Sequence, residues 1–195
     1  MSKRQDKRRR TDLDLFILAL IDGGVATPYD LQKSAGLSQG ATIPALQRLL
    51  EARLVRQGKH GPRGRTDYKV TLAGKTLLKD GWLALIEGGP SGDVDSDLRV
   101  ALLALLGGGD RRLSVDFLRQ SADRKMESAR AVEPLGNPGR LAPLPRLYIE
   151  LRSSTAKALL TAESVAIRAM ADALPRKLSG KPGHSTRAAK KQKGS

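Results

Sequence analysis

The sequence predicts a mainly α-helical protein that contains one two-stranded β-hairpin. Apolar residues recur at three- and four-residue steps along most of the 195 residues, which is the period of an amphipathic helix. Only between residues 54 and 71 does the pattern change to the alternation typical of strands. Pairs of glycines and clusters of prolines separate these segments. The length suits one compact domain or two small ones with a real core.

The first two helices have clear start and stop signals. Thr11 or Asp12 can cap a helix that ends before residues 23–24, a glycine pair. The second helix opens with Thr27 as N-cap and a proline at its first position, and it closes at Gly36. Two short helices at the start of the chain are therefore expected.

A third helix is expected from Ser38 or Gly40 to residue 53, with Ile43 as part of its apolar stripe. Pro44 lies inside this helix, where a proline costs about 3 kcal/mol. The cost shrinks if Gly40 is the cap, because only the first helical hydrogen bond would then be missing.

The hairpin that follows is expected to have strands at residues 54–56 and 67–71. Residues 58–65 lie between the strands and are rich in glycine and basic side chains. This composition predicts a long, mobile and positively charged tip.

The rest of the chain is expected to be helical. One helix is predicted over residues 72–87, and three more over 98–106, 112–132 and 146–174. These boundaries divide the chain into a basic disordered arm (1–10), a helix-and-hairpin domain (11–89), an acidic linker (90–97), a helical region (98–175) and a basic disordered tail (176–195).

The net charge of +15 is concentrated at the two ends of the chain. Residues 1–10 carry six Lys or Arg against one acid, and residues 176–195 carry seven and no acid, so the two ends together hold +12. A polyanion is the natural partner of such a chain. Considered alone, the basic residues at the two ends are explained equally well by a role in keeping the protein soluble.

The order helix, short helix, turn, helix and basic hairpin is that of a winged helix-turn-helix domain. In such a domain the third helix enters the major groove of double-stranded DNA with its first residues toward the base edges. The cations of the hairpin suit phosphates or the minor groove. The candidate DNA-binding residues are Ser38, Gln39, Ala41 and Thr42 in the helix and Lys59, His60, Arg63 and Arg65 in the wing. Helix-start chemistry is the alternative interpretation of Gln39 and Thr42.

Four segments resemble the DNA-binding domain of the PadR family of transcriptional regulators. They are Ile-Leu-Ala-Leu-Ile at 17–21, Pro-Tyr-Asp-Leu at 28–31, Gly-Ala-Thr-Ile-Pro-Ala-Leu-Gln-Arg-Leu at 40–49 and Arg-Gly-Arg-Thr-Asp-Tyr-Lys-Val-Thr-Leu-Ala-Gly at 63–74. The family pattern has a proline where this chain has Pro44. The resemblance implies a DNA-binding regulator with a helical C-terminal region that dimerises. MarR-type regulators share the broad pattern, so the subfamily stays open.

Three positions depart from the family pattern. Pro28 replaces a glycine, and Ile43 replaces a tyrosine that in relatives commonly helps to contact DNA. Arg53 replaces a turn glycine.

The last predicted helix is long enough to project beyond a small domain and to need a partner. Its apolar residues at helical spacing are the candidate dimerisation residues: Tyr148, Leu151, Leu159, Ala162, Ala166 and Met170. A twofold homodimer is expected. Packing against residues 98–106 of the same chain is the alternative.

Composition argues against several other functions. There is no cysteine and only two histidines, so we expect no metal site, no cofactor and no catalytic triad, and we expect the protein not to be an enzyme. No apolar run reaches roughly 20 residues, so no membrane span is expected and a cytoplasmic location is favoured. A dimeric transcriptional regulator controlled by a small-molecule ligand or by a partner is the first interpretation. A non-regulatory nucleic-acid-binding or partner-recruitment protein is the second.

Overall fold

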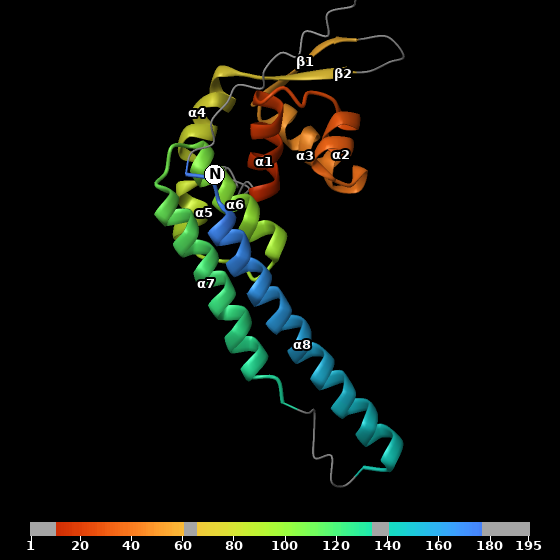
Figure 1. Cartoon of the computed structure of the whole chain (residues 1–195). Helices are drawn as coiled ribbons and strands as arrows, with labels where there is room; N and C mark the ends of the chain where they lie inside the picture. The colour runs from red at the N-terminus through yellow and green to blue at the C-terminus, as the bar shows by residue number, and fades with distance from the viewer. Residues whose placement is uncertain (1–10, 61–65, 134–140, 177–195) are drawn as a thin grey trace, which may run out of the picture.

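The computed structural model describes residues 11–60, 66–133 and 141–176 (Figure 1). The expected basic arm, the basic tail and most of the hairpin tip lie outside these residues. The elements in chain order are α1 (Asp12–Asp22), α2 (Pro28–Ala35), α3 (Gln39–Glu51), β1 (Val55–His60), β2 (Thr66–Val70), α4 (Leu72–Asp80), α5 (Leu83–Glu87), α6 (Val94–Leu106), α7 (Arg111–Arg130) and α8 (Pro143–Ala173). The prediction of a mainly helical chain with one two-stranded antiparallel sheet is confirmed.

The helix starts that the sequence predicted are formed by side-chain caps. The Thr11 hydroxyl accepts a hydrogen bond from the Asp14 amide, and the Asp14 carboxylate accepts one from the Thr11 amide, so α1 begins with a complete capping box. The Thr27 and Ser38 hydroxyls accept from the Asp30 and Ala41 amides and cap α2 and α3. Gly36 ends α2 in the left-handed conformation, with φ of 67°.

Pro44 lies in the interior of α3 and not next to its cap. Because Ser38 is the N-cap, the helix begins before Gly40, and the Thr42 amide already donates to the Ser38 carbonyl. Of the two expected starts, Ser38 and Gly40, the first is the one that forms, so the lower cost that Gly40 as cap would have given Pro44 does not apply. Pro44 removes the hydrogen bond to the Gly40 carbonyl one turn into the helix.

The two strands are antiparallel and place Val55 opposite Val70 and Arg56 opposite Lys69. β1 runs on to His60, so the expected loop at residues 58–60 is wrong. The register shifts between Gln57 and His60, as in a β-bulge, and Gly58 lies within this irregularity.

The single helix expected over residues 72–87 is two helices, α4 and α5, which meet at Gly81. A Cβ at Gly81 would lie 2.6 Å from the Leu77 carbonyl oxygen and 3.2 Å from the Leu15 side chain. The Leu77 carbonyl leaves no room for a Cβ there, and the Leu15 side chain of α1 packs against the same position. The break allows Trp82 to turn inward, where it is buried.

α6 begins at Val94 with Asp93 as N-cap, so the expected start at Asp97 is wrong. Asp97 is instead buried in the first turns of α6. Its carboxylate accepts hydrogen bonds from the Ser91 amide and hydroxyl and from the Ser121 hydroxyl on α7, at 2.7, 2.9 and 2.5 Å. This carboxylate fixes the segment before α6 and joins α6 to α7.

Two larger core clusters are joined by a smaller one. The first lies between α1, α2, α3 and the sheet, and the second between α6, α7 and the end of α8. Leu15 of α1, Trp82, and Leu103 and Ala104 of α6 form the cluster that connects them. Trp82 lies so close to Gly107 that a Cβ there would be 1.9 Å from the indole nitrogen.

α7 and α8 form a long hairpin that extends away from the rest of the molecule (Figure 1). α8 begins at Pro143, three residues before its expected start, and packs along α7. Only its last turns, at Ile167, Ala171 and Leu174, also share a core with α6. Among the described residues, no helix combines the length and apolar character that crossing a bilayer requires.

Candidate nucleic-acid interface

The helix-turn-helix unit is built on α1. Leu31 of α2 and Leu46 and Leu49 of α3 are buried against Ile17 and Leu18 of α1. The left-handed turn at Gly36 redirects the chain within three residues, from the end of α2 to the cap of α3. These contacts fix α3 in place and leave its opposite face open to solvent.

The first turn of α3 presents two of the predicted residues to solvent. Ser38 and Gln39 are exposed, and Ala41 is half-buried. The side-chain nitrogen Nε2 of Gln39 donates to Oε1 of Gln32 on α2 at 3.4 Å. This hydrogen bond orients the Gln39 side chain across the turn between the two helices. Gln39 can therefore meet a ligand that approaches the start of α3.

Thr42 does not lie on this exposed face. Its side chain is only 1% exposed, and its hydroxyl donates to the Ser38 carbonyl at 2.8 Å. The expected role of Thr42 as a DNA-binding residue is incompatible with this burial, and Thr42 drops out of the candidate set. The alternative interpretation of Thr42 as helix-start chemistry matches its geometry.

Two residues on the exposed face of α3 were not among the predicted site residues. Ile43 is 47% exposed, so its assignment to the apolar stripe is wrong, and Gln47 is exposed as well. Gln39, Ile43 and Gln47 follow one another at four-residue steps, which places them on one face of the helix. That spacing is visible in the sequence and could have identified the face.

The one arginine of α3 is directed toward the protein and not toward this face. Arg48 forms two hydrogen bonds through Nε and one through Nη2 with the buried carboxylate of Asp14 on α1, at 2.5–3.2 Å. These hydrogen bonds raise the pKa of Arg48, and desolvation lowers it by a smaller amount. Arg48 thus has a structural role in joining α3 to α1.

The sheet carries two cations directly opposite each other. Arg56 of β1 and Lys69 of β2 are register partners and both are exposed. Directly opposite residues share one face of a sheet, and like charges in this position are destabilising. A pair of this kind is favourable when a bound anion lies over it.

The predicted wing residues lie further along the hairpin. Lys59 and His60 belong to β1, but only their backbone is described. Arg63 and Arg65 lie outside the described residues.

Arg53 joins α3 to β1 in an unusual conformation. Its φ is 55°, the left-handed region, and among the described residues it is the one non-glycine residue with positive φ. This is the position at which the PadR pattern has a glycine. The side chain is exposed, so it adds a third cation close in sequence to Arg56.

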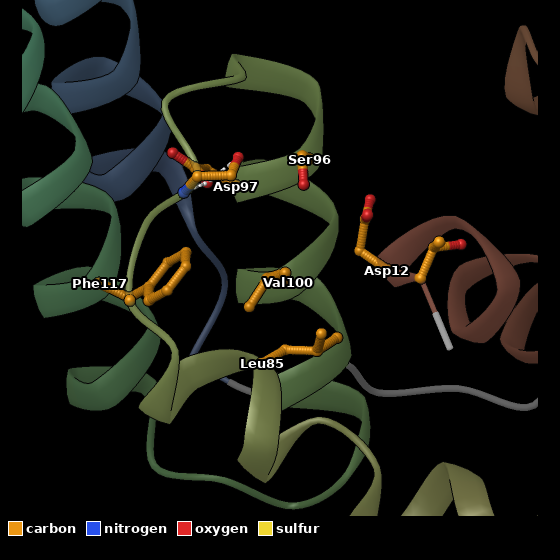
Figure 2. A pocket seen from close by; sticks show the side chains of 9 residues that line it. Asp12, Leu85, Ser96, Asp97, Val100 and Phe117 are labelled. Carbon is orange, nitrogen blue, oxygen red and sulfur yellow. Dashed lines mark hydrogen bonds between the residues drawn. The ribbon is translucent and has the colours of Figure 1, made fainter. Parts of the chain in front are cut away.

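A cavity of about 270 Å³ lies at the start of α1, beside α5, α6 and α7. Figure 2 shows Phe117 and Asp12 on opposite sides of it, with Val100 and Leu85 between them and Asp97 at its edge. Asp12 is paired with Arg99 at 2.6 Å. The cavity is slightly smaller than a typical ligand pocket, and it is where a small-molecule effector would find apolar contacts. Within the described part of the chain, no group of His, Cys, Asp and Glu has an arrangement that could hold a metal ion.

Most of the predicted dimerisation residues are exposed on α8. Tyr148, Leu151 and Leu159 are 62%, 59% and 60% exposed, and Ala162 and Ala166 are exposed too. Met170 is different, because it packs against the core between α6, α7 and α8. It therefore does not belong to the outward face.

Comparison with known proteins assigns no family to this arrangement. No family model matches the chain, and no curated protein matches it.

Proposed function

We propose that this protein is a sequence-specific double-stranded DNA-binding transcriptional regulator, similar to PadR proteins, that acts as a homodimer. The proposal treats α1, α2, α3 and the hairpin as a winged helix-turn-helix domain. The observation that carries it is the exposed face of α3, where Gln39, Ile43 and Gln47 lie in line.

The chemistry of this face suits base edges in the major groove. A glutamine amide can donate to and accept from adenine, and an aliphatic side chain can contact the methyl group of thymine. The groove admits a single α-helix, and α3 has 13 residues, about 20 Å in length. Gln39, Ile43 and Gln47 would therefore read A·T-containing steps.

The cations of the sheet would contact phosphates on either side of the groove. Arg56 and Lys69 stand next to each other across the strands, and a phosphate between them would relieve their repulsion. Such contacts fix the protein on the duplex and carry no sequence information. In a twofold dimer the two α3 helices would lie about 34 Å apart on a pseudo-palindromic site.

Selection of bound sequences from random duplex DNA with the purified full-length protein tests the proposal. A preferred sequence is expected. Gln39→Ala should weaken binding to it by about tenfold and binding to random DNA far less. The matched control is Gln120→Ala on the exposed face of α7, which should leave both affinities unchanged.

The other outcomes identify the alternatives. Binding of all sequences with equal affinity would contradict sequence-specific regulation and indicate a non-regulatory nucleic-acid-binding protein. Absence of duplex binding at low salt would contradict the DNA-binding proposal and favour partner recruitment.

A further inference from the structure

α8 carries a stripe of exposed residues along the whole of its outward face. We call this the outer stripe: Leu144, Tyr148, Leu151, Thr155, Ala158, Ala162, Ala166 and Ala169. The residues follow one another at three- and four-residue steps, so they lie on one face of the helix. Each of them is exposed.

The opposite face of α8 is already covered by α7. Ser164, Ile167 and Ala171 are buried on that side, and the Ser164 hydroxyl donates to the Ala122 carbonyl of α7 at 2.8 Å. Lys125 of α7 pairs with Glu163 at 2.5 Å. One face of α8 therefore packs against α7 in the hairpin. The other face is left open to solvent by the described residues.

α8 is also longer than its partner in the hairpin. It has 31 residues against 20 in α7, which corresponds to about 46 Å against about 30 Å. The first turns of α8 extend beyond the end of α7 (Figure 1). They carry the largest exposed side chains, with Leu144 at 77% and Tyr148 at 62% exposure. An apolar overhang of this kind is unfavourable in water unless another surface covers it.

The outer stripe changes in size from one end to the other. Its first half consists of leucine, tyrosine, leucine and threonine, and its second half consists of four alanines. The distance between two packed helices depends on the side chains at their contact and ranges over about 8–10 Å. A stripe with this size gradient is complementary to itself only when one of the two copies is reversed.

We infer that the outer stripes of two copies of this chain pair in antiparallel orientation, about a twofold axis between residues 156 and 157. This inference rests on the homodimer of the proposed function and adds its geometry. In this register Leu144 lies level with Ala169 of the second copy, and Leu151 lies level with its Ala162. Leu144, Leu151 and Thr155 then each lie level with an alanine, and Tyr148 lies level with Val165.

Parallel pairing fits the stripe less well. It would place Leu144 against Leu144 at one end and Ala169 against Ala169 at the other, so the helices could not pack closely along their length. It would also bring Arg152 level with Arg152 of the second copy, so two like charges would lie close together. The antiparallel register brings Arg152 level with the neutral Thr161 instead.

Disulfide cross-linking of the full-length protein tests the orientation directly, because the chain has no cysteine of its own. We expect a mixture of L144C and A169C, distinguished by tags of different mass, to form the mixed disulfide dimer on mild oxidation. Each variant alone should form several-fold less. L151C with A162C is a second pair whose residues are level with each other in the same register. It controls for a local effect of either substitution in the first pair. S34C, on α2, is the matched control and should not cross-link.

Three outcomes would overturn the inference. One is efficient cross-linking of L144C with itself, which would indicate parallel helices. Another is equal cross-linking of all pairs, including S34C. The third is sedimentation of the full-length protein as a monomer at micromolar concentration. None of these uses DNA, so failure of the dimer geometry is distinguished from failure of DNA recognition.

A second measurement separates the two orientations by packing. A162L adds bulk where the antiparallel pairing has a leucine opposite, so the dissociation constant of the dimer should rise at least tenfold. In a parallel pairing the same leucine would fill the gap between two alanines, and the dimer would be tighter. A73L on α4 is exposed and serves as the control.

Discussion

The guanidinium of Arg48 and the carboxylate of Asp14 join α3 to α1 through a hydrogen-bonded ion pair. Asp14 is 3% exposed, and it also completes the capping box of α1 with Thr11. One buried carboxylate thus starts the first helix and orients the helix that carries the proposed base-reading face. The orientation of α3 on the domain depends on this pair.

Asp14→Ala should lower the free energy of unfolding by about 2–3 kcal/mol. The substitution removes the carboxylate half of the capping box and leaves Arg48 without its partner, although the partial exposure of Arg48 moderates the loss. Urea denaturation followed by circular dichroism measures it. Lys75→Ala is the control, because its pair with Asp22 is exposed and 3.8 Å long, and about 0.5 kcal/mol or less is expected. Equal effects of the two substitutions would contradict the role of Asp14.

The contribution of Arg48 should not vary with pH near neutrality. Its pKa is raised above the already strongly basic value of a free arginine, so the stability that it adds is complete at every pH below that ordinary pKa and is lost only as the pH rises beyond it. The difference in stability between the natural protein and Arg48→Met should therefore be the same at pH 6 and at pH 9. A difference that disappears at pH 9 would disagree with this.

Gly74 and Gly40 should respond to alanine in opposite directions. A Cβ at Gly74 would lie 2.3 Å from the Leu54 carbonyl oxygen and 2.7 Å from the Val70 side chain, so Gly74→Ala must separate α4 from the sheet, at a cost of about 2 kcal/mol or more. At Gly40 a Cβ meets nothing within 4 Å, and alanine should stabilise α3 by about 0.5–1 kcal/mol. Thermal unfolding of both variants provides the comparison. Stabilisation by Gly74→Ala would be inconsistent with the close approach of α4 to the sheet.

Arg53→Gly should stabilise the protein by about 0.5–1 kcal/mol. The left-handed conformation costs a residue with a Cβ about 1–2 kcal/mol, and the greater freedom of glycine in the unfolded chain offsets part of that gain. Chemical denaturation tests this, with Arg53→Val as a control that should destabilise. If Arg53 contacts phosphate together with Arg56, Arg53→Gly should also weaken binding to all DNA sequences alike.

The pair Arg56→Gln and Lys69→Gln should change stability and DNA binding in opposite directions. Removal of two like charges from opposite strand positions should raise the free energy of unfolding by a few tenths of a kcal/mol. The same change should weaken DNA binding and reduce the slope of log affinity against log salt by about 2. Lys79→Gln, on the exposed face of α4, is the control. An unchanged salt slope would mean that the sheet does not contact phosphates.

Local signals in the sequence determined the elements and many of their ends. Thr11, Thr27, Ser38 and Thr71 cap the helices that follow them, because a cap needs only a hydroxyl and a free amide three residues later. The antiparallel hairpin and the long last helix were predicted for the same reason, since strand alternation and helical periodicity are properties of a short stretch of chain.

Contacts between distant segments decided the rest. Thr42 is buried and Ile43 is exposed because of how α3 lies on α1, and the residue types at these positions suggest the reverse. One predicted helix is divided in two next to Gly81, against which Leu15 of α1 packs, and Asp97 is a buried acceptor because Ser121 comes from α7. Periodicity in the sequence can identify a helix, but the neighbours of each face depend on how all the helices share one interior, which only the tertiary structure determines.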